Sequence, residues 1–269
     1  MTNGSAILEL HGATKSFGSV QALVDVDFEV REGEVMALVG DNGAGKSTLI
    51  KCVAGIHPFD SGEVYFGGKR VSIHSPKDAV ALGIEVVYQD LALCDNLDVV
   101  SNLFLGSEEL GGGPQRLFRV LDETSMEHRS HQLLDQLAVS IPSVRSEVGT
   151  LSGGQRQQVA VARSLLGEPK MVMLDEPTAA LGVAQTAQVL QLIKRLRERG
   201  LAVVVISHNM VDVFEVADRI YVLRLGAENG IYNVKDTTRD EIVSAITGSK
   251  IANGNETPPA ADRGEDVTA

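Results

Sequence analysis

Residues 40–47, Gly-Asp-Asn-Gly-Ala-Gly-Lys-Ser, constrain the fold more than any other stretch of the chain. They fit the pattern G-x-x-x-x-G-K-[ST], which binds phosphate when it follows a strand and opens a helix. The apolar run at 35–39 predicts a buried strand before the loop, and residues 48–54 predict a helix after it. A chance match to a short pattern is the alternative, and the predicted strand and helix on either side disfavour it.

The residue types of this loop predict how it would hold a chain of phosphates. Its glycines allow backbone N–H groups to turn inward and approach an anion closely at a helix N-terminus. We expect Lys46 to meet the β- and γ-phosphates of a nucleotide and Ser47 to hold Mg²⁺. The other expected nucleotide-binding positions of this stretch are Gly40, Asn42, Gly43, Ala44, Gly45 and Thr48.

Composition narrows the class of partner. The 269 residues are 43% hydrophobic and 22% charged, which is ordinary for a soluble globular protein. The formal net charge of −12 disfavours a nucleic-acid partner, although plain solubility also explains much of that acidity. No apolar run reaches the length of a membrane span, and we expect no signal peptide in the polar N-terminus. Two cysteines fit a reducing cytoplasm but decide little.

The periodicity along the chain predicts an α/β protein with a phosphate-loop core, a mainly parallel sheet with flanking helices, and a small antiparallel β-subdomain. Residues 24–30 alternate strictly, so we expect Val24 and the three apolar residues that follow it at alternate positions to share one buried face. Residues 62–73 predict a hairpin with Gly67-Gly68 at its turn. We expect a turn at residues 14–18.

A mostly helical subdomain is expected between two parts of the core. One helical pattern runs from 91 to 105, with a polar loop near Asp95-Asn96, and another runs from 122 to 137. A flexible surface insertion is expected at 107–114. The final residues are rich in Gly, Pro, Ala and acidic side chains, which predicts disorder. The predicted division is therefore 1–89 for the β-subdomain and phosphate-loop part of the core, 90–165 for the helical subdomain, 166–250 for the remaining core, and 251–269 for a disordered tail.

A second glycine-containing segment, Leu151-Ser152-Gly153-Gly154-Gln155, leads into a predicted helix over residues 156–166. Adjacent glycines at a helix N-terminus repeat the anion-binding geometry of the phosphate loop. A simple turn is the alternative interpretation of this pentapeptide.

Acidic residues follow a further buried strand at 171–174, in the sequence Asp175-Glu176-Pro177. Carboxylates at the end of a buried strand are costly without a partner. Asp175 is suited to orient Mg²⁺ through water and Glu176 to polarise an attacking water, with a helix N-cap pair as the alternative. The strand at 202–206 ends at His208. A lone histidine is more often structural, but this one falls at the sheet edge where α/β proteins bind ligands.

Together these motifs resemble the nucleotide-binding subunit of an ABC transporter, from about Ile7 to Thr247. The resemblance implies that Phe17 stacks on adenine beside Val20, and that Gln89 senses Mg²⁺ and touches the membrane subunit. It implies that Ser152, Gly153, Gly154 and Gln155 cap the γ-phosphate of ATP bound to the opposite subunit. It makes Glu176 the catalytic glutamate and His208 the switch histidine, so the expected catalytic residues are Glu176, His208 and Gln89 and the expected Mg²⁺ positions are Ser47, Gln89 and Asp175.

The finer resemblance is to the ATP-binding subunits of monosaccharide importers, the ribose, xylose and fructose group. Residues 88–93, 96–99, 102–106, 178–183 and 207–210 carry it. It implies a second ATP-binding subunit (a copy of this chain or a partner), transmembrane permease subunits and, indirectly, an extracytoplasmic sugar-binding protein. It also implies a cytoplasmic location, peripheral on the inner face of the cell membrane.

One position departs from the family pattern. The loop after the catalytic glutamate usually ends in Asp, and this chain has Gly182, which removes that carboxylate and adds backbone freedom. A low-turnover regulatory subunit is therefore one alternative, although Glu176 and His208 are both retained. A non-transport ABC ATPase is another, disfavoured by the net acidity and by the absence from the sequence of large insertions or zinc motifs.

Overall fold

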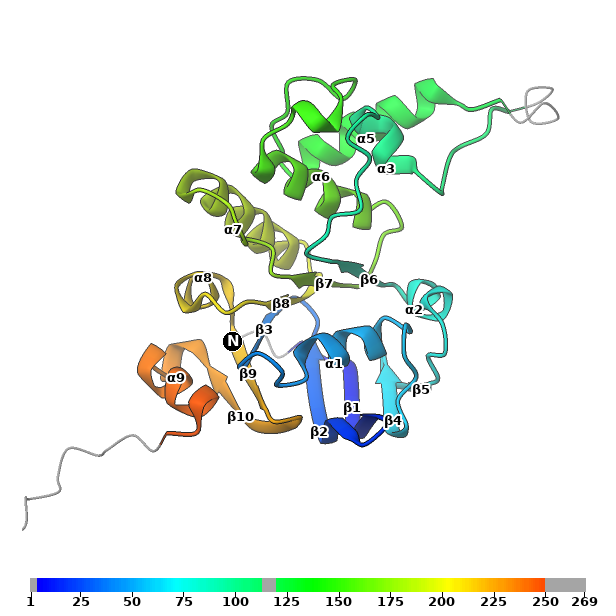
Figure 1. The fold of residues 1–269 in the computed structure, drawn as a ribbon. Coiled ribbons are helices and arrows are strands. Elements are labelled where there is room, and N and C mark those ends of the chain that lie inside the picture. Colours follow the sequence, from blue (N-terminus) through cyan, green and yellow to red (C-terminus); the bar gives the residue numbers. More distant parts are fainter. Residues whose placement is uncertain (1–3, 113–119, 250–269) are drawn as a thin grey trace, which may run out of the picture.

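A computed structural model describes residues 4–112 and 120–249 of the chain (Figure 1). The expected disordered tail and the last two residues of the expected insertion lie outside the described residues. Among the described residues, none of the helices combines the length and the apolar character needed to cross a membrane.

The core is a six-stranded sheet with the strand order β10-β9-β3-β8-β7-β6. Strands β9, β3, β8, β7 and β6 run parallel to one another, and β10 pairs antiparallel with β9 at one edge. Their bounds are β3 Val35–Val39, β6 Ile84–Val87, β7 Met171–Asp175, β8 Ala202–Ile206, β9 Arg219–Arg224 and β10 Ala227–Asn233. The predicted α/β fold class is confirmed, and the parallel strands all end at one edge of the sheet.

The central strands are apolar throughout because both of their faces are covered. In β3, Val35, Ala37 and Val39 face a hydrophobic cluster on one side of the sheet. The alternate residues Met36 and Leu38 face a second cluster on the other side. A continuous apolar run in a short strand is therefore the pattern expected for burial on two faces.

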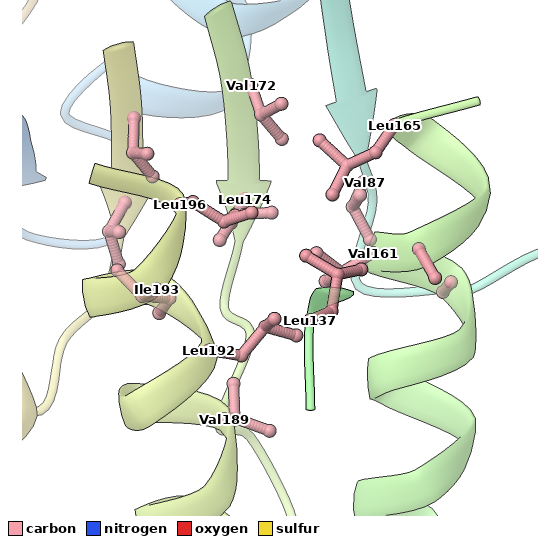
Figure 2. Close-up of a cluster of buried hydrophobic side chains, with 14 of the residues drawn as sticks. Val87, Leu137, Val161, Leu165, Val172, Leu174, Val189, Leu192, Ile193 and Leu196 are labelled. Atoms are coloured by element: carbon pink, nitrogen blue, oxygen red, sulfur yellow. The ribbon is translucent and has the colours of Figure 1, made fainter. Parts of the chain in front are cut away.

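Helices α6 (Gly153–Ser164), α7 (Val183–Glu198) and α8 (Met210–Val216) contribute to the first cluster. Figure 2 shows Val161 and Leu165 of α6 near Val87 of β6, and Leu192 of α7 pointing into the same cluster. Four apolar residues of α7 recur at helical spacing and are buried as the amphipathic pattern predicts: Val189, Leu190, Ile193 and Leu196.

The smaller sheet is antiparallel, in the order β2-β1-β4-β5, and contributes to the second cluster together with α1 (Lys46–Val53). Its bounds are β1 Ala6–Phe17, β2 Val20–Arg31, β4 Ser61–Phe66 and β5 Lys69–Val71. The predicted hairpin turn is present, because Gly67 and Gly68 both have positive φ between β4 and β5.

Two local predictions in this sheet are wrong. Residues 14–17 form the end of β1 rather than a turn, because they pair with the start of β2 and with Ser61. Val24 is exposed, and Leu23 is buried in its place. Asp25 has φ +50° and marks an irregular register between β1 and β2, which shifts the alternation by one residue.

The segment between β6 and β7 contains α3 (Val99–Phe104), α5 (Glu123–Gln136), the 3-10 turn η1 (Val148–Thr150) and α6. The expected helical stretch at 91–105 is helical only from Val99 to Phe104. The polar loop expected near Asp95-Asn96 is present at 94–98, where the buried side chain of Asn102 bonds the backbone of Cys94, Leu97 and Asp98. The remaining elements are α2 (Pro76–Leu82), η2 (Val234–Asp236) and α9 (Arg239–Thr247).

Candidate functional site

Four loops meet at the edge where the parallel strands end. The phosphate loop follows β3, His208 follows β8, Glu176 follows β7 and Gln89 follows β6. Because β3, β8, β7 and β6 are consecutive neighbours in the sheet, these four loops are also neighbours in that order. Ligands of open α/β sheets bind at the carboxyl ends of the strands, so this edge is the candidate site.

The phosphate loop is packed so closely that two of its glycines cannot carry a side chain. A β-carbon on Gly40 would lie 2.1 Å from the carbonyl oxygen of Leu223, and one on Gly45 would lie 2.5 Å from that of Ala22. Gly43 also has positive φ, but no atom lies within 4 Å of the position a β-carbon would take. The loop therefore packs against the protein at Gly40 and Gly45 and is open to solvent at Gly43. An anion could approach its backbone N–H groups from that open side.

Lys46 lies in the first turn of α1 and bends back over the loop. Its Nζ donates to the carbonyl oxygens of Gly40 at 2.6 Å and Asp41 at 2.9 Å. Burial lowers the pKa of Lys46, opposed by the nearby carboxylates of Glu176, Asp41 and Asp175. The ammonium group therefore shares one electrostatic environment with Asp175, the last residue of β7, and with Glu176, which follows it. The hydroxyl-bearing residues Ser47 and Thr48 stand in the same helical turn.

The two acids differ in their surroundings. Burial raises the pKa of Asp175, and Glu176 raises it further, while Lys46 and Lys51 oppose the shift. Glu176 has the left-handed backbone angle φ +49°, which is strained for a residue with a side chain. Its carboxylate lies 2.9 Å from Nδ1 of His208. The structure thus brings Glu176 and His208 into direct contact, although 32 residues separate them in the chain.

Gln89 is exposed in the loop after β6, next to the strand that carries the acids. Tyr88, which sequence reasoning passed over, lies close enough to Asp175 that burial and that carboxylate together raise its pKa. In the sequence, Tyr88 stands beside Gln89 within the 88–93 stretch that carries the finer resemblance.

Phe17 and Val20 face each other across the β1–β2 turn and are both exposed, at 45% and 63%. The Phe17 ring meets that of His57 edge-to-face at 5.2 Å between centroids, and Nζ of Lys15 lies 5.5 Å from its centroid. The start of β2 packs against the phosphate loop through Ala22 and Gly45. An exposed aromatic ring held at its edge leaves area for stacking against a planar group.

The second glycine segment forms the N-terminus of α6. Ser152 caps the helix, since its Oγ accepts from the N–H of Gln155, and Gln155 Oε1 accepts in return from the N–H of Ser152. Gly154 is buried against α7, where a β-carbon would lie 2.8 Å from Cβ of Gln185. Gly153 lies beside Leu181.

This segment and the phosphate loop stay apart within one chain. In the described parts of the chain, no hydrogen bond or ion pair joins residues 151–155 to residues 40–47, and Figure 1 shows α6 and α1 in separate parts of the molecule. The expected nucleotide-binding residues therefore fall into two groups that one copy of the chain does not assemble.

The expected Mg²⁺ positions form an oxygen-donor set: the hydroxyl of Ser47, the amide of Gln89 and the carboxylate of Asp175. Mg²⁺ keeps several waters and shares ligands with substrate phosphates, so one carboxylate with neutral oxygens fits it. No cluster of three or more His, Cys, Asp or Glu able to hold a metal occurs in residues 4–112 and 120–249.

Comparison with known proteins decides the family. Residues 23–179 match the sequence profile of the ABC transporter family, and this range includes the phosphate loop, the 151–155 segment and Glu176. The chain belongs to the ABC transporter family. Its recognition from sequence motifs is confirmed, and nucleotide binding is a property of that family.

Among curated ABC proteins, the chain is 45% identical to a xylose/arabinose import ATP-binding protein of Sulfolobus acidocaldarius, covering 93% of this chain and 98% of that one. It is 47% identical to a fructose import ATP-binding protein of Rhizobium meliloti, with 91% and 95% covered. A ribose import ATP-binding protein of Rhizobium meliloti is 41% identical over 92% of this chain but only 47% of its own length.

Solved ABC cassettes share the fold. An ATP-binding cassette of an ABC transporter in its ADP conformation matches with a TM-score of 0.76 and 27% identity, over 90% of this chain and 95% of that chain. A dimeric cassette in a post-hydrolysis state bound to ADP and Pi matches with a TM-score of 0.70 and 25% identity, over 86% and 100%.

Proposed function

We propose that this ABC protein is the ATP-binding and hydrolysing subunit of an importer that energises uptake of a monosaccharide through partner permease subunits. Two relatives covered over nearly their whole length are named as sugar import ATP-binding proteins, and this supports the proposal. The observation that carries the catalytic part is the contact of Glu176 with His208 beside the phosphate loop.

The phosphate loop would hold the phosphates of ATP. Gly40 and Gly45 keep its backbone against the protein, and Gly43 leaves the opposite side open to a ligand. The ammonium group of Lys46, which now donates to the carbonyl oxygens of Gly40 and Asp41, would instead donate to the β- and γ-phosphates. Phe17, with Val20 beside it, would stack on adenine. When bound, Mg²⁺ would neutralise phosphate charge, held by Ser47, Gln89 and Asp175.

Glu176 would orient and polarise the water that attacks the γ-phosphate. Its side chain is 18% exposed, so it is partly withdrawn from solvent, whereas that of His208 is 77% exposed and free to reach a ligand. Both carboxylate oxygens of Glu176 lie 2.9 Å from Nδ1 of His208, and this contact would hold the carboxylate in place beside the attacking water. His208 would then hold the γ-phosphate and that water in one geometry.

The functional unit we propose is a head-to-tail pair of ATP-binding subunits. Within one chain, α6 and α1 lie in separate parts of the molecule (Figure 1), so a second copy would supply Ser152 and Gly154 of its α6 N-terminus to each ATP. The dimeric cassette with ADP and Pi supports pairing as a mode of this fold. Closure would favour ATP over ADP because the second copy would contact the γ-phosphate, and that difference shifts the open–closed equilibrium.

Residues 1–89 and 166–250 would form the ATP-binding core. Gln89 and the helices at 90–165 would transmit the opening and closing of the dimer to the permease. A groove of about 420 Å³ adjoins Gln89, between Val87, Leu91, Leu103 and Arg163. Its apolar walls and charged rim suit a short segment of a membrane subunit. The chain would then be peripheral on the cytoplasmic face of the cell membrane, and an extracytoplasmic sugar-binding protein would take part indirectly.

ATP turnover by the purified chain, with and without its permease, tests the proposal. We expect Lys46→Ala to lose nucleotide affinity, and Glu176→Gln to bind ATP but stall as a dimer. Normal hydrolysis by Glu176→Gln would refute the assigned catalytic role. Sugar uptake into vesicles that depends on this chain would test the transport part separately.

A further inference from the structure

Three successive contacts tie the loop after β7 to the segment after β8. The N–H of Glu176 donates to the carbonyl oxygen of Ile206 at 3.0 Å. The carboxylate of Glu176 then meets His208 at 2.9 Å. Beyond them, Oγ1 of Thr178 donates to Oδ2 of Asp212 at 2.7 Å. The Glu176–His208 contact therefore lies between two other hydrogen bonds that join the same two segments, and the Thr178–Asp212 bond is the last of the three along the chain.

The contact between Glu176 and His208 contributes little to the stability of this arrangement by itself. The His208 side chain is 77% exposed, so water competes for its contact with Glu176 and weakens what that contact contributes. Asp212 is only 6% exposed and lies in the first turn of α8. A hydrogen bond from a hydroxyl to a buried carboxylate is one of the stronger hydrogen bonds in proteins. The Thr178–Asp212 bond is therefore stronger than the Glu176–His208 contact.

The loop also needs an external constraint. Both Glu176 (φ +49°) and Ala180 (φ +59°) adopt left-handed backbone, which flanks Thr178 on either side. Strained residues keep such conformations only where the surrounding structure holds them. Backbone bonds within the loop run from the N–H of Ala179 to Glu176 and from the N–H of Leu181 to Thr178. The side chain of Thr178 adds a bond that reaches out of the loop to α8.

We propose that Thr178 and Asp212 are positioning residues for ATP hydrolysis, which together fix the placement of Glu176 relative to His208. This inference rests on the catalytic roles proposed above for Glu176 and His208. Neither Thr178 nor Asp212 contacts the reacting atoms in this arrangement. They act by keeping the loop after β7 and the start of α8 at one separation.

Asp212 has a second role that must be separated from this one. A carboxylate in the first turn of a helix is stabilised by the helix N-terminus, so its removal would weaken α8 for an unrelated reason. Thr178→Val avoids the difficulty because it deletes the donor, keeps the side-chain shape and leaves Asp212 in place. Thr178→Ser restores the hydroxyl and serves as the rescue variant.

The experiment measures kcat and KM for ATP in the full chain. A displacement of about an ångström at reacting groups can cost about 100-fold in rate. We therefore expect Thr178→Val to lower kcat about 10-fold or more, with KM within about twofold of wild type. Thr178→Ser should recover kcat to within about threefold. Ser125→Ala is the matched control, since it removes a 2.7 Å hydroxyl–carboxylate bond to Glu109 in the helical subdomain, and its kcat should not change.

Two outcomes would overturn the inference: kcat of Thr178→Val within twofold of wild type, or a fall in kcat accompanied by an equal rise in KM. If Thr178→Val does not fold, Thr178→Ala decides in the same way, because it also deletes the donor and leaves Asp212 in place. A crystal structure of the folded variant gives a readout independent of turnover. We expect the Glu176–His208 separation to exceed hydrogen-bond range, and an unchanged separation would refute the positioning role. Absent turnover in the wild-type chain would instead refute the proposed function.

Discussion

Replacing Gly45 with alanine tests whether the phosphate loop is as tightly enclosed as its contacts indicate. Gly45 has φ +105°, and a β-carbon there would lie 2.5 Å from the carbonyl oxygen of Ala22 and 3.1 Å from a methyl group of Leu23. Left-handed backbone costs an L-residue about 1–2 kcal/mol. Forcing an extra carbon into a filled site costs about 1–3 kcal/mol more. Alanine also lowers the entropy of the unfolded chain, which offsets about 0.4–1 kcal/mol. We therefore expect Gly45→Ala to lose about 1–5 kcal/mol of unfolding free energy.

Gly43→Ala is the matched control for this change. Its φ of +81° gives a similar backbone penalty, but nothing lies within 4 Å of the new carbon. The penalty of about 1–2 kcal/mol is partly offset because alanine lowers the entropy of the unfolded chain by about 0.4–1 kcal/mol.

The assay is thermal unfolding without nucleotide, followed by titration with ATP. At about 2–4 °C per kcal/mol, Gly45→Ala should lower Tm by about 2–18 °C, and Gly43→Ala by about 6 °C at most. Gly45→Ala should also lose ATP-dependent stabilisation, because its loop must shift away from Ala22. Equal shifts in Tm for the two variants would refute the argument from close packing.

Three further predictions concern stability. Arg219→Met should cost about 3–5 kcal/mol of unfolding free energy, because the buried carboxylate of Glu34 loses the guanidinium group 2.8 Å away. Denaturant titration measures this loss, and KM for ATP should stay unchanged. Gly182→Asp should raise stability by a few tenths of a kcal/mol in the same titration, because Gly182 precedes α7 without a side-chain cap and only Gln185 lies near a new β-carbon; a loss would contradict the open geometry. Asp175→Asn should raise Tm at neutral pH, because a carboxyl whose pKa is raised by folding destabilises the protein once ionised. That gain should shrink as pH falls through the raised pKa toward the ordinary one, and a gain that grew on acidification would contradict the sign.

The parts of the fold that sequence predicted are those set by local patterns. The apolar runs at 35–39, 171–174 and 202–206 are central strands, and the helical spacing at 183–199 gives α7. The loop at 40–47 was predictable because its glycines, Lys46 and Ser47 are close in sequence and have separate physical reasons to be there.

Contacts between distant residues account for what sequence reasoning missed. The irregularity at Asp25 that exposes Val24 arises from pairing between β1 and β2. The Thr178–Asp212 bond spans 34 residues, and no local pattern in either segment indicates it.

A structure of the Glu176→Gln variant trapped with ATP tests the central claim most directly. That claim is that each ATP lies between the phosphate loop of one copy and the N-terminus of α6 of another. We predict that Ser152 and Gly154 of one copy lie within hydrogen-bond range of the γ-phosphate held by Lys46 of the other. A trapped dimer in which both residues lie far from every nucleotide would contradict the account.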